Sequence, residues 1–299
     1  MCCVVKKWKI LKTLAYFKLI RPKQWSKNVF VFVPLFFSGE FQVENVNRAI
    51  LGFFVFCTLC SAIYVLNDWF DIEADRQHKK KRTRPLASGL VFKKEASFLI
   101  LLLFLMTICV CFFQNYSIST LAYLVFYGVL NIAYSLRLKH IPILELFILA
   151  SGFIVRLLFG AAVVEVTLSL WIIICTGLLS LMLAIGKRRG DLVQNNDGKM
   201  MRKSLTYYNL TFLDQINVLS ATTTFTGYLI FCTTSFAINR FGQEVIITAV
   251  FVLFGILSYL RLLILDEAGD DPTSLVLGDN GIRIAILFWI ISFAILIYF

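Results

Sequence analysis

Long uncharged stretches separated by short polar segments run through the whole chain. Apolar stretches of about 18 residues or more predict membrane-spanning helices. We place nine of them at about 28–38, 49–67, 96–113, 118–136, 142–164, 167–186, 216–238, 245–264 and 283–299. The first is short and contains Pro34. The pattern predicts an all-α membrane protein with nine transmembrane helices.

Residues 1–27 precede these spans and have a different character, because bases alternate there with aromatic side chains. Trp8, Tyr16, Phe17 and Trp25 stand between lysines. A basic segment with aromatic side chains is typical of helices that lie in the membrane interface. We therefore expect 1–27 to be an interfacial N-terminal segment, and 1–299 to form a single integral membrane domain.

The composition agrees with a membrane protein. Hydrophobic residues make up 59% of the 299 residues, against about 45–50% in soluble domains. The formal net charge of +11 could also indicate binding to nucleic acid. In a chain this apolar, cytoplasmic loops and anionic lipid headgroups explain the positive charge better, so we predict a lipid bilayer and no nucleic acid as partner.

The basic residues are distributed unequally between the two sets of loops. With nine spans, one set holds the N-terminus and every large loop, and 26 of the 29 lysines and arginines fall in it. The other set holds only Arg48 and Arg240, and Arg156 lies inside a span. Positive charge marks the cytoplasmic side of a membrane protein. We expect the N-terminus and the large loops to face the cytoplasm, in the cell (inner) membrane.

One segment, 64–89, carries the clearest candidate chemistry. Asn67, Asp71 and Asp75 are spaced i, i+4, i+8, which puts them on one helix face about 6 Å apart per step, and Asp68 lies about 100° round the helix from Asn67. Few oxygen ligands on an open face suit Mg²⁺, which completes its shell with water and substrate phosphates. The cations that follow are Arg76, Lys79, Lys80, Lys81, Arg82 and Arg84. A metal beside cations predicts a diphosphate site. The alternative is a solvated loop rich in both charges.

Further charged residues lie in or beside the predicted cytoplasmic loops. The candidates are Tyr134, Arg137, Lys139, Lys187, Arg188 and Arg189. Within the span at 142–164, a charge at mid-membrane costs at least about 2.5–3.5 kcal/mol and normally faces the bundle interior. Arg156 is therefore a candidate site residue, with a structural ion pair as the alternative, and Glu145 is a weaker candidate near the cytoplasmic end. Cys57 and Cys60 form a CxxC inside a span, where we interpret them as small apolar residues.

The motif NDxxDxxxD at 67–75 resembles the first aspartate motif of the UbiA prenyltransferase superfamily. Three further segments are similar to the branch that contains decaprenyl-phosphate phosphoribosyltransferase. They are RPKQWSKN (21–28), YSLRLKHIPILELFILASGFIVRLLFGA (134–161) and DPTSLVLGD (271–279). The resemblance covers essentially the whole chain. It implies a UbiA-like bundle with a cytoplasm-facing cavity that also opens laterally to lipid.

The resemblance also implies an activity. Members of this branch transfer 5-phosphoribose from phosphoribosyl diphosphate (PRPP) to a polyprenyl phosphate and release diphosphate, and the product feeds arabinofuranose donors for the cell envelope. Mg²⁺ would be the cofactor, bound by Asn67 and Asp71 with support from Asp68 and Asp75. The positions that match PRPP contacts are Lys27, Tyr64, Lys81 and the neighbouring Arg82. Lys139 and Arg156 match positions associated with the lipid phosphate, and Tyr134, Glu145, Lys187 and Arg188 are further candidates.

The sequence departs from the family pattern at two places. His78-Lys79 stands where the family often has His-Pro, and Glu145, with its longer side chain, where it usually has aspartate. In addition, Lys139 and Arg156 are seventeen residues apart, about 25 Å on a straight helix. We therefore expect both to be cavity residues rather than a joint clamp on one phosphate.

Two other functions remain open. The first is a UbiA-type reaction in which an isoprenyl diphosphate alkylates an aromatic acceptor. Those enzymes usually carry a second DxxxD motif, whereas Asp191 and Asp197 here are six residues apart, off the helical period. The second is a transporter of an anionic lipid or metabolite, which a buried arginine would also suit. The lipid's length and the oligomeric state, a homo-oligomer included, also stay open.

Overall fold

The computed structural model describes residues 12–77, 81–194, 203–265 and 272–298. Within them the chain forms helices and loops and no strand, so the all-α prediction is confirmed for the described residues. Two compact units are present. Unit one holds the described residues within 1–36, 40–136 and 155–166, and unit two those within 37–39, 137–154 and 167–299.

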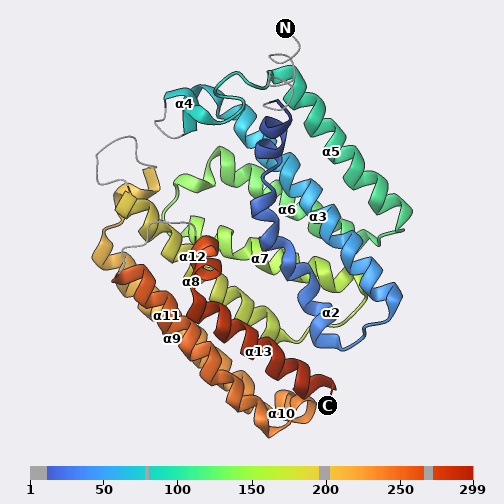
Figure 1. The fold of residues 1–299 in the computed structure, drawn as a ribbon, viewed down its shortest axis with the longest axis vertical. Coiled ribbons are helices and arrows are strands. Elements are labelled where there is room, and N and C mark those ends of the chain that lie inside the picture. Colours follow the sequence, from blue (N-terminus) through green and yellow to red (C-terminus); the bar gives the residue numbers. More distant parts are fainter. Residues whose placement is uncertain (1–11, 78–80, 195–202, 266–271, 299) are drawn as a thin grey trace. The chain divides into compact units, whose positions relative to one another are not determined.

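Unit one is built on the long helix α3 (Figure 1). Its helices are 12–20, the 3-10 helix η1 (Pro22–Phe32), α2 (Val33–Ser38, which runs into unit two), α3 (Val43–Phe70), α4 (Ile72–Gln77), the 3-10 helix η2 (Lys81–Thr83), α5 (Lys93–Phe113), α6 (Ile118–Leu136) and the second half of α7 (Leu144–Val163). α5 lies along α3, and η1 contacts α3 as well. Twelve residues of α3 are buried, so it forms the centre of this unit.

Unit two is a second group of helices, in which α9 lies beside α8, and α11 beside α9 and α13 (Figure 1). Its helices are the 3-10 helix η3 (Leu138–His140), the first half of α7, α8 (Leu170–Gln194), the 3-10 helix η4 (Lys203–Tyr207), α9 (Leu210–Thr233), α10 (Ser235–Phe241), the 3-10 helix η5 (Gln243–Ile247), α11 (Thr248–Ile264), α12 (Pro272–Gly278) and α13 (Asn280–Tyr298). Side chains cap two of these helices. Asn209 Oδ1 accepts a hydrogen bond from Phe212 N at 2.7 Å, and Thr234 Oγ1 one from Ala237 N at 3.2 Å.

Seven helices of the described residues are long and apolar enough to cross a membrane. They are α3, α5, α6, α7, α8, α13 and the continuous stretch Gln243–Ile264 formed by η5 and α11. Seven of the nine predicted spans therefore have a matching helix, and the count of nine stays a prediction.

The other two predicted spans, 28–38 and 216–238, are not among these seven helices, and their local structure explains why. The predicted span 28–38 falls in η1 and α2, and a straight path through both would extend about 30 Å, enough for a bilayer core. α9 has 24 residues, but polar side chains interrupt its apolar sequence. Among these, Asn217, Ser220 and Thr224 are buried and so face protein rather than lipid.

The 3-10 conformation of η1 explains how it docks on its neighbours. Side chains three residues apart eclipse each other in a 3-10 helix, which puts Trp25, Asn28 and Val31 on one face. Trp25 Nε1 donates to Ser61 Oγ at 3.1 Å and Asn28 Nδ2 contacts Cys57 Sγ at 3.1 Å, both on α3. Val31 is fully buried and lies against Gly160, where a Cβ would clash with the Val31 carbonyl oxygen. Gly160 is therefore required for this close approach.

We expect Gly160→Ala to lower the melting temperature of the purified protein in detergent, because overpacking a helix contact costs about 1–3 kcal/mol. The matched control is Gly128→Ala on α6, since a Cβ there meets no atom within 4 Å. That variant should melt at or slightly above the wild-type temperature. Equal melting temperatures for the two variants would contradict the proposed close contact.

Candidate functional site

The end of α3 and the start of α4 carry the four predicted metal residues. α3 ends at Phe70, yet the backbone hydrogen bonds of the helical period continue across the junction. Asp71 N donates to Asn67 O at 3.0 Å, and Asp75 N to Asp71 O at 2.8 Å. The i, i+4, i+8 relation read from the sequence is therefore preserved through the break between the two helices.

Two of these acids are held by arginines. Asp68 Oδ1 lies 2.5 Å from Arg21 Nη2 and 3.0 Å from Arg84 Nη1. The same Arg84 nitrogen lies 2.7 Å from Asp75 Oδ2. Both carboxylates are only 3% exposed. Arg84 thus bridges α3 and α4, and we call Arg21, Asp68, Asp75 and Arg84 the arginine bridge.

Asn67 and Asp71 differ from the acids of the arginine bridge. Both side chains are half-buried, and neither forms a hydrogen bond or ion pair with any residue that the structure describes. One amide oxygen and one carboxylate match Mg²⁺, which is commonly held by one or two carboxylates plus substrate phosphates. The described residues contain no group of three or more His, Cys, Asp or Glu side chains that could hold a metal, so a ligand-rich metal cage does not form there.

Arg21 is a member of the arginine bridge that sequence reasoning missed. Its φ of 51° is in the left-handed region, where a non-glycine residue costs about 1–3 kcal/mol. The guanidinium lies over the Tyr64 ring, 5.0 Å from its centroid, while it binds Asp68. The arginine directly before Pro22 in RPKQWSKN was the available signal, but its partner is 47 residues away in the sequence.

Arg156 lies in a buried polar cluster of unit one and is 5% exposed. Its Nε donates to Asn28 Oδ1 at 2.8 Å and its Nη2 to Tyr127 Oη at 2.7 Å. Cys60 Sγ lies 3.8 Å from Nη2, and the guanidinium lies over the Phe56 and Tyr127 rings, 5.2 and 4.9 Å from their centroids. The interpretation of Cys60 as merely apolar is therefore too simple, because it is part of this polar cluster.

Unit two has a buried cluster of its own at the end of α8. Glu145 and Arg188 are at most 1% exposed, with Glu145 Oε2 3.0 Å from Arg188 Nε. Although these atoms are close, the N–H is not aligned with the carboxylate, so the contact is an ion pair rather than a hydrogen bond. Arg188 also pairs with Asp191. The neighbouring Arg189 pairs with Asp214 at 2.5 Å and donates to the Leu263 carbonyl at 2.6 Å.

The other predicted residues lie in both units. In unit one, Lys27 is in η1, Lys81 and Arg82 are in η2, and Tyr134 is near the end of α6. In unit two, Lys139 is in η3 and Lys187 is in the last turns of α8. Arg82 is exposed and the other five are half-buried. His78, Lys79, Lys80 and Asp197 lie outside the described residues.

Comparison with known protein families shows which family this chain belongs to. The sequence profile of the UbiA prenyltransferase family matches residues 29–291. The chain belongs to this family. The predicted family membership is thereby confirmed, and with the apolar helices it makes the chain a multi-pass membrane protein.

Relatives with similar sequences span almost the whole chain. Decaprenyl-phosphate phosphoribosyltransferase of Mycolicibacterium smegmatis is 31% identical over 299 residues, covering 94% of this chain and 92% of that protein. The Mycobacterium tuberculosis H37Rv protein of the same name is 30% identical, with 91% of each chain covered. A 4-hydroxybenzoate octaprenyltransferase of Pasteurella multocida is 28% identical, but over 54% of this chain and 57% of that protein.

Solved structures confirm the fold. A UbiA homolog from Archaeoglobus fulgidus bound to GPP and Mg²⁺ superposes with a TM-score of 0.70 at 14% identity, covering 95% of this chain and all of that one. A digeranylgeranylglyceryl phosphate synthase gives a TM-score of 0.64 at 20% identity, covering 95% and 98% of the two chains. At such low identity these likenesses establish the shared fold alone.

The arginine bridge generates a prediction for the segment after η2. Arg84→Gln should speed backbone hydrogen exchange in 84–91, because the bridge fixes this segment, and the bonds from Ser88 N to Arg84 O and from Val91 N to Pro85 O belong to it. The matched control is Arg82→Gln, which removes an exposed charge two residues away. If both variants exchange alike, the bridge does not hold the segment.

Proposed function

We propose that this protein transfers 5-phosphoribose from PRPP to a polyprenyl phosphate of decaprenyl type and releases diphosphate. The observation that carries the proposal is the similarity, over more than nine-tenths of the chain, to proteins named decaprenyl-phosphate phosphoribosyltransferase. The α3 end supports it chemically, since uncommitted oxygen ligands there stand beside a cationic segment. The product would supply arabinofuranose donors for the cell envelope.

The reaction makes modest demands on the protein. A phosphate oxygen of the lipid attacks C1 of the ribose, the bond from C1 to the diphosphate oxygen breaks, and diphosphate leaves with the electron pair. The attacking phosphate is already an anion near neutral pH, so no general base is needed. The protein has to bind two anionic substrates, orient them in line and stabilise charge on the leaving group.

The diphosphate side of the site is assigned to unit one. Asn67 and Asp71 would hold Mg²⁺, which when bound neutralises charge on the diphosphate oxygens. Asp68 and Asp75, predicted as further metal residues, would act through the arginine bridge, which keeps α3 and α4 in register. The residues proposed to bind PRPP are Lys27, Tyr64, Lys81 and Arg82. Arg21 would orient Tyr64 through the contact of its guanidinium with the ring.

Lys139 and Arg156 are proposed as two separate candidates for contact with the polyprenyl phosphate, rather than as a joint clamp. Arg156 is buried, and hydrogen bonds to Asn28 and Tyr127 hold its guanidinium, so the cation proposed for the phosphate has a fixed position. Tyr134, Lys187 and the pair of Glu145 with Arg188 are further candidates near the reaction. Because of this ion pair, Glu145 would act by orienting Arg188.

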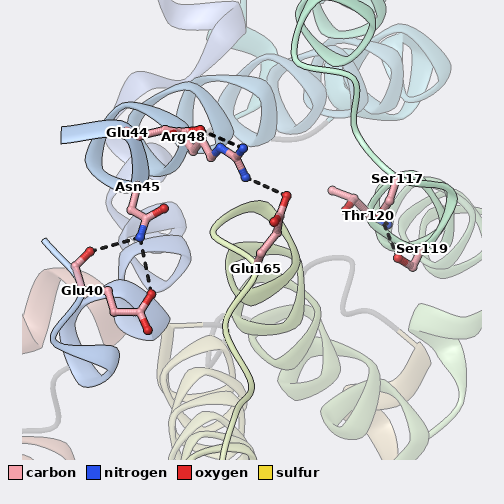
Figure 2. Close-up of polar contacts among 8 residues, drawn as sticks. All are labelled: Glu40, Glu44, Asn45, Arg48, Ser117, Ser119, Thr120 and Glu165. Atoms are coloured by element: carbon pink, nitrogen blue, oxygen red, sulfur yellow. Dashed lines mark hydrogen bonds and ion pairs between the residues drawn. The ribbon is translucent and has the colours of Figure 1, made fainter. Parts of the chain in front are cut away.

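The orientation follows from the charge asymmetry of the loops. We infer a single integral domain in the inner membrane, with nine spans, the interfacial segment 1–27, and the N-terminus and catalytic loops on the cytoplasmic side. The two basic residues of the opposite loops have structural partners. Arg48 pairs with Glu44 at 2.9 Å and Glu165 at 2.6 Å (Figure 2), and Arg240 donates to the Phe37 and Ser38 carbonyls. A homo-oligomer is compatible with this assignment.

The alternative prenyl transfer to an aromatic acceptor is less well supported. Asp191, the acid available near the end of α8, is paired with Arg188 and so is not poised as a second metal ligand. The relative that acts as an octaprenyltransferase aligns with about half of this chain. Transport of an anionic lipid is the remaining alternative, and Mg²⁺-dependent release of diphosphate separates it from catalysis.

Purified protein incubated with polyprenyl phosphate and radiolabelled PRPP should form labelled lipid with Mg²⁺ and none with EDTA. Asp71→Ala should lower turnover by about 100-fold or more without changing the melting temperature, because it removes a metal ligand. Asn67→Ala should be severe and partly rescued by excess Mg²⁺. Asp75→Asn is the control, expected to keep the wild-type Mg²⁺ requirement. Wild-type turnover by Asp71→Ala would exclude the metal assignment.

The two substrate subsites should separate kinetically. Lys81→Ala should raise the KM for PRPP and Arg156→Ala the KM for polyprenyl phosphate, since each removes a cation assigned to one anion. Tyr127→Phe is the control for Arg156, because it removes a hydrogen bond of the cluster while the cation remains. A purely structural Arg156 would instead lower the melting temperature and shift neither KM selectively, leaving Lys139 as the lipid-phosphate residue.

A further inference from the structure

The turn that starts α7 has a strained backbone. Ile143 has φ of +62°, a value that β-branched residues rarely adopt, and its side chain is 51% exposed. Leu144 N donates to Pro142 O at 2.7 Å, so the three residues form a γ-turn centred on Ile143. With positive φ this is the classic γ-turn, the rare and strained form. Since the Ile143 side chain is largely exposed, burial does not explain why the strain is kept.

A hydrogen bond from a distant residue holds the turn. Ile143 N donates to Tyr208 Oη at 2.6 Å, across 65 residues of sequence. Tyr208 itself is well fixed, because it is 7% exposed, packs with Leu205 and Leu213, and stacks on Phe212 with ring centroids 6.0 Å apart. The Ile143 N–H of the strained turn therefore donates to a tyrosine hydroxyl whose position is fixed by packing.

Functional candidates lie on both sides of this turn. Lys139 precedes it in η3, whose end is joined to the turn through Ile141 N donating to Leu138 O at 3.1 Å. Glu145 follows it, fully buried, with Arg188 as its ion-pair partner. Glu145 N also donates to Ile141 O at 3.2 Å, so a change at Ile143 would alter the direction of η3 relative to α7.

We propose that Tyr208 is a positioning residue for the lipid-phosphate subsite. By accepting the Ile143 N–H it keeps the γ-turn strained and thereby aims Lys139 at the phosphate of the polyprenyl substrate. This inference rests on the proposed function for the role of Lys139. If the turn relaxed, η3 would change its direction relative to α7, and Lys139 would no longer be directed at the phosphate.

Tyr208→Phe removes only the hydroxyl. It should raise the KM for polyprenyl phosphate about two- to tenfold, the fold-change expected from one hydrogen bond, with the KM for PRPP and the Mg²⁺ requirement unchanged. Tyr207→Phe is the matched control, because Tyr207 is 72% exposed and adjacent in sequence, and it should behave as wild type.

Glycine adopts positive φ without strain, so Ile143→Gly should make the hydroxyl dispensable. Adding Ile143→Gly to Tyr208→Phe should return the KM for polyprenyl phosphate toward the wild-type value. Absence of this rescue, or a Tyr208→Phe variant with a wild-type KM for the lipid, would overturn the proposal. A lower melting temperature with neither KM moved selectively would likewise make Tyr208 merely structural.

Amide hydrogen exchange separates this proposal from the proposed function. Exchange of the Ile143 amide should be faster in Tyr208→Phe than in wild type or Tyr207→Phe. If the wild type forms no phosphoribosyl lipid, the proposed function fails, and this exchange still reports whether Tyr208 holds the turn. If exchange is unchanged while the wild type is active, the positioning role alone fails.

Discussion

The arginine bridge is the interaction on which the α3 end of unit one depends. Two carboxylates that are almost fully buried, Asp68 and Asp75, would repel each other and lose hydration if no cation met them. Arg84 binds both and Arg21 binds one, so two cations balance the two carboxylates. Arg21 makes its contact with Asp68 from a left-handed backbone, with φ of 51°.

The bridge also divides the four clustered polar residues by role. The acids that bind arginine have their oxygens committed, whereas Asn67 and Asp71 keep theirs. The proposed site for a diphosphate and Mg²⁺ would use both kinds, since a metal requires uncommitted oxygens and the scaffold has to stay rigid under a highly charged substrate. Aspartates one helical turn apart can therefore serve different purposes when their environments differ.

Buried charges elsewhere in the two units follow the same physical rule. Arg156 has the neutral partners Asn28 and Tyr127, while Arg188 and Arg189 are met by acids. Desolvating a charge is costly unless it is paired or hydrogen-bonded, so each guanidinium has a network of contacts. The carboxylate partners of Arg188 and Arg189 tie those two arginines to their surroundings in unit two.

The helices of this protein and the helical period of its acidic motif could be predicted from sequence, because both depend on local spacing and on hydrophobicity over short windows. Arg84 and Asp75 are nine residues apart, so even part of the bridge was within reach of local reasoning. Tertiary structure decided the rest. Arg21 meets Asp68 across 47 residues and Asn28 meets Arg156 across 128, and no local pattern encodes such pairs. The 3-10 form of η1 was equally hidden, because its register comes from docking on α3 and at Gly160, contacts that exist only once the chain has folded.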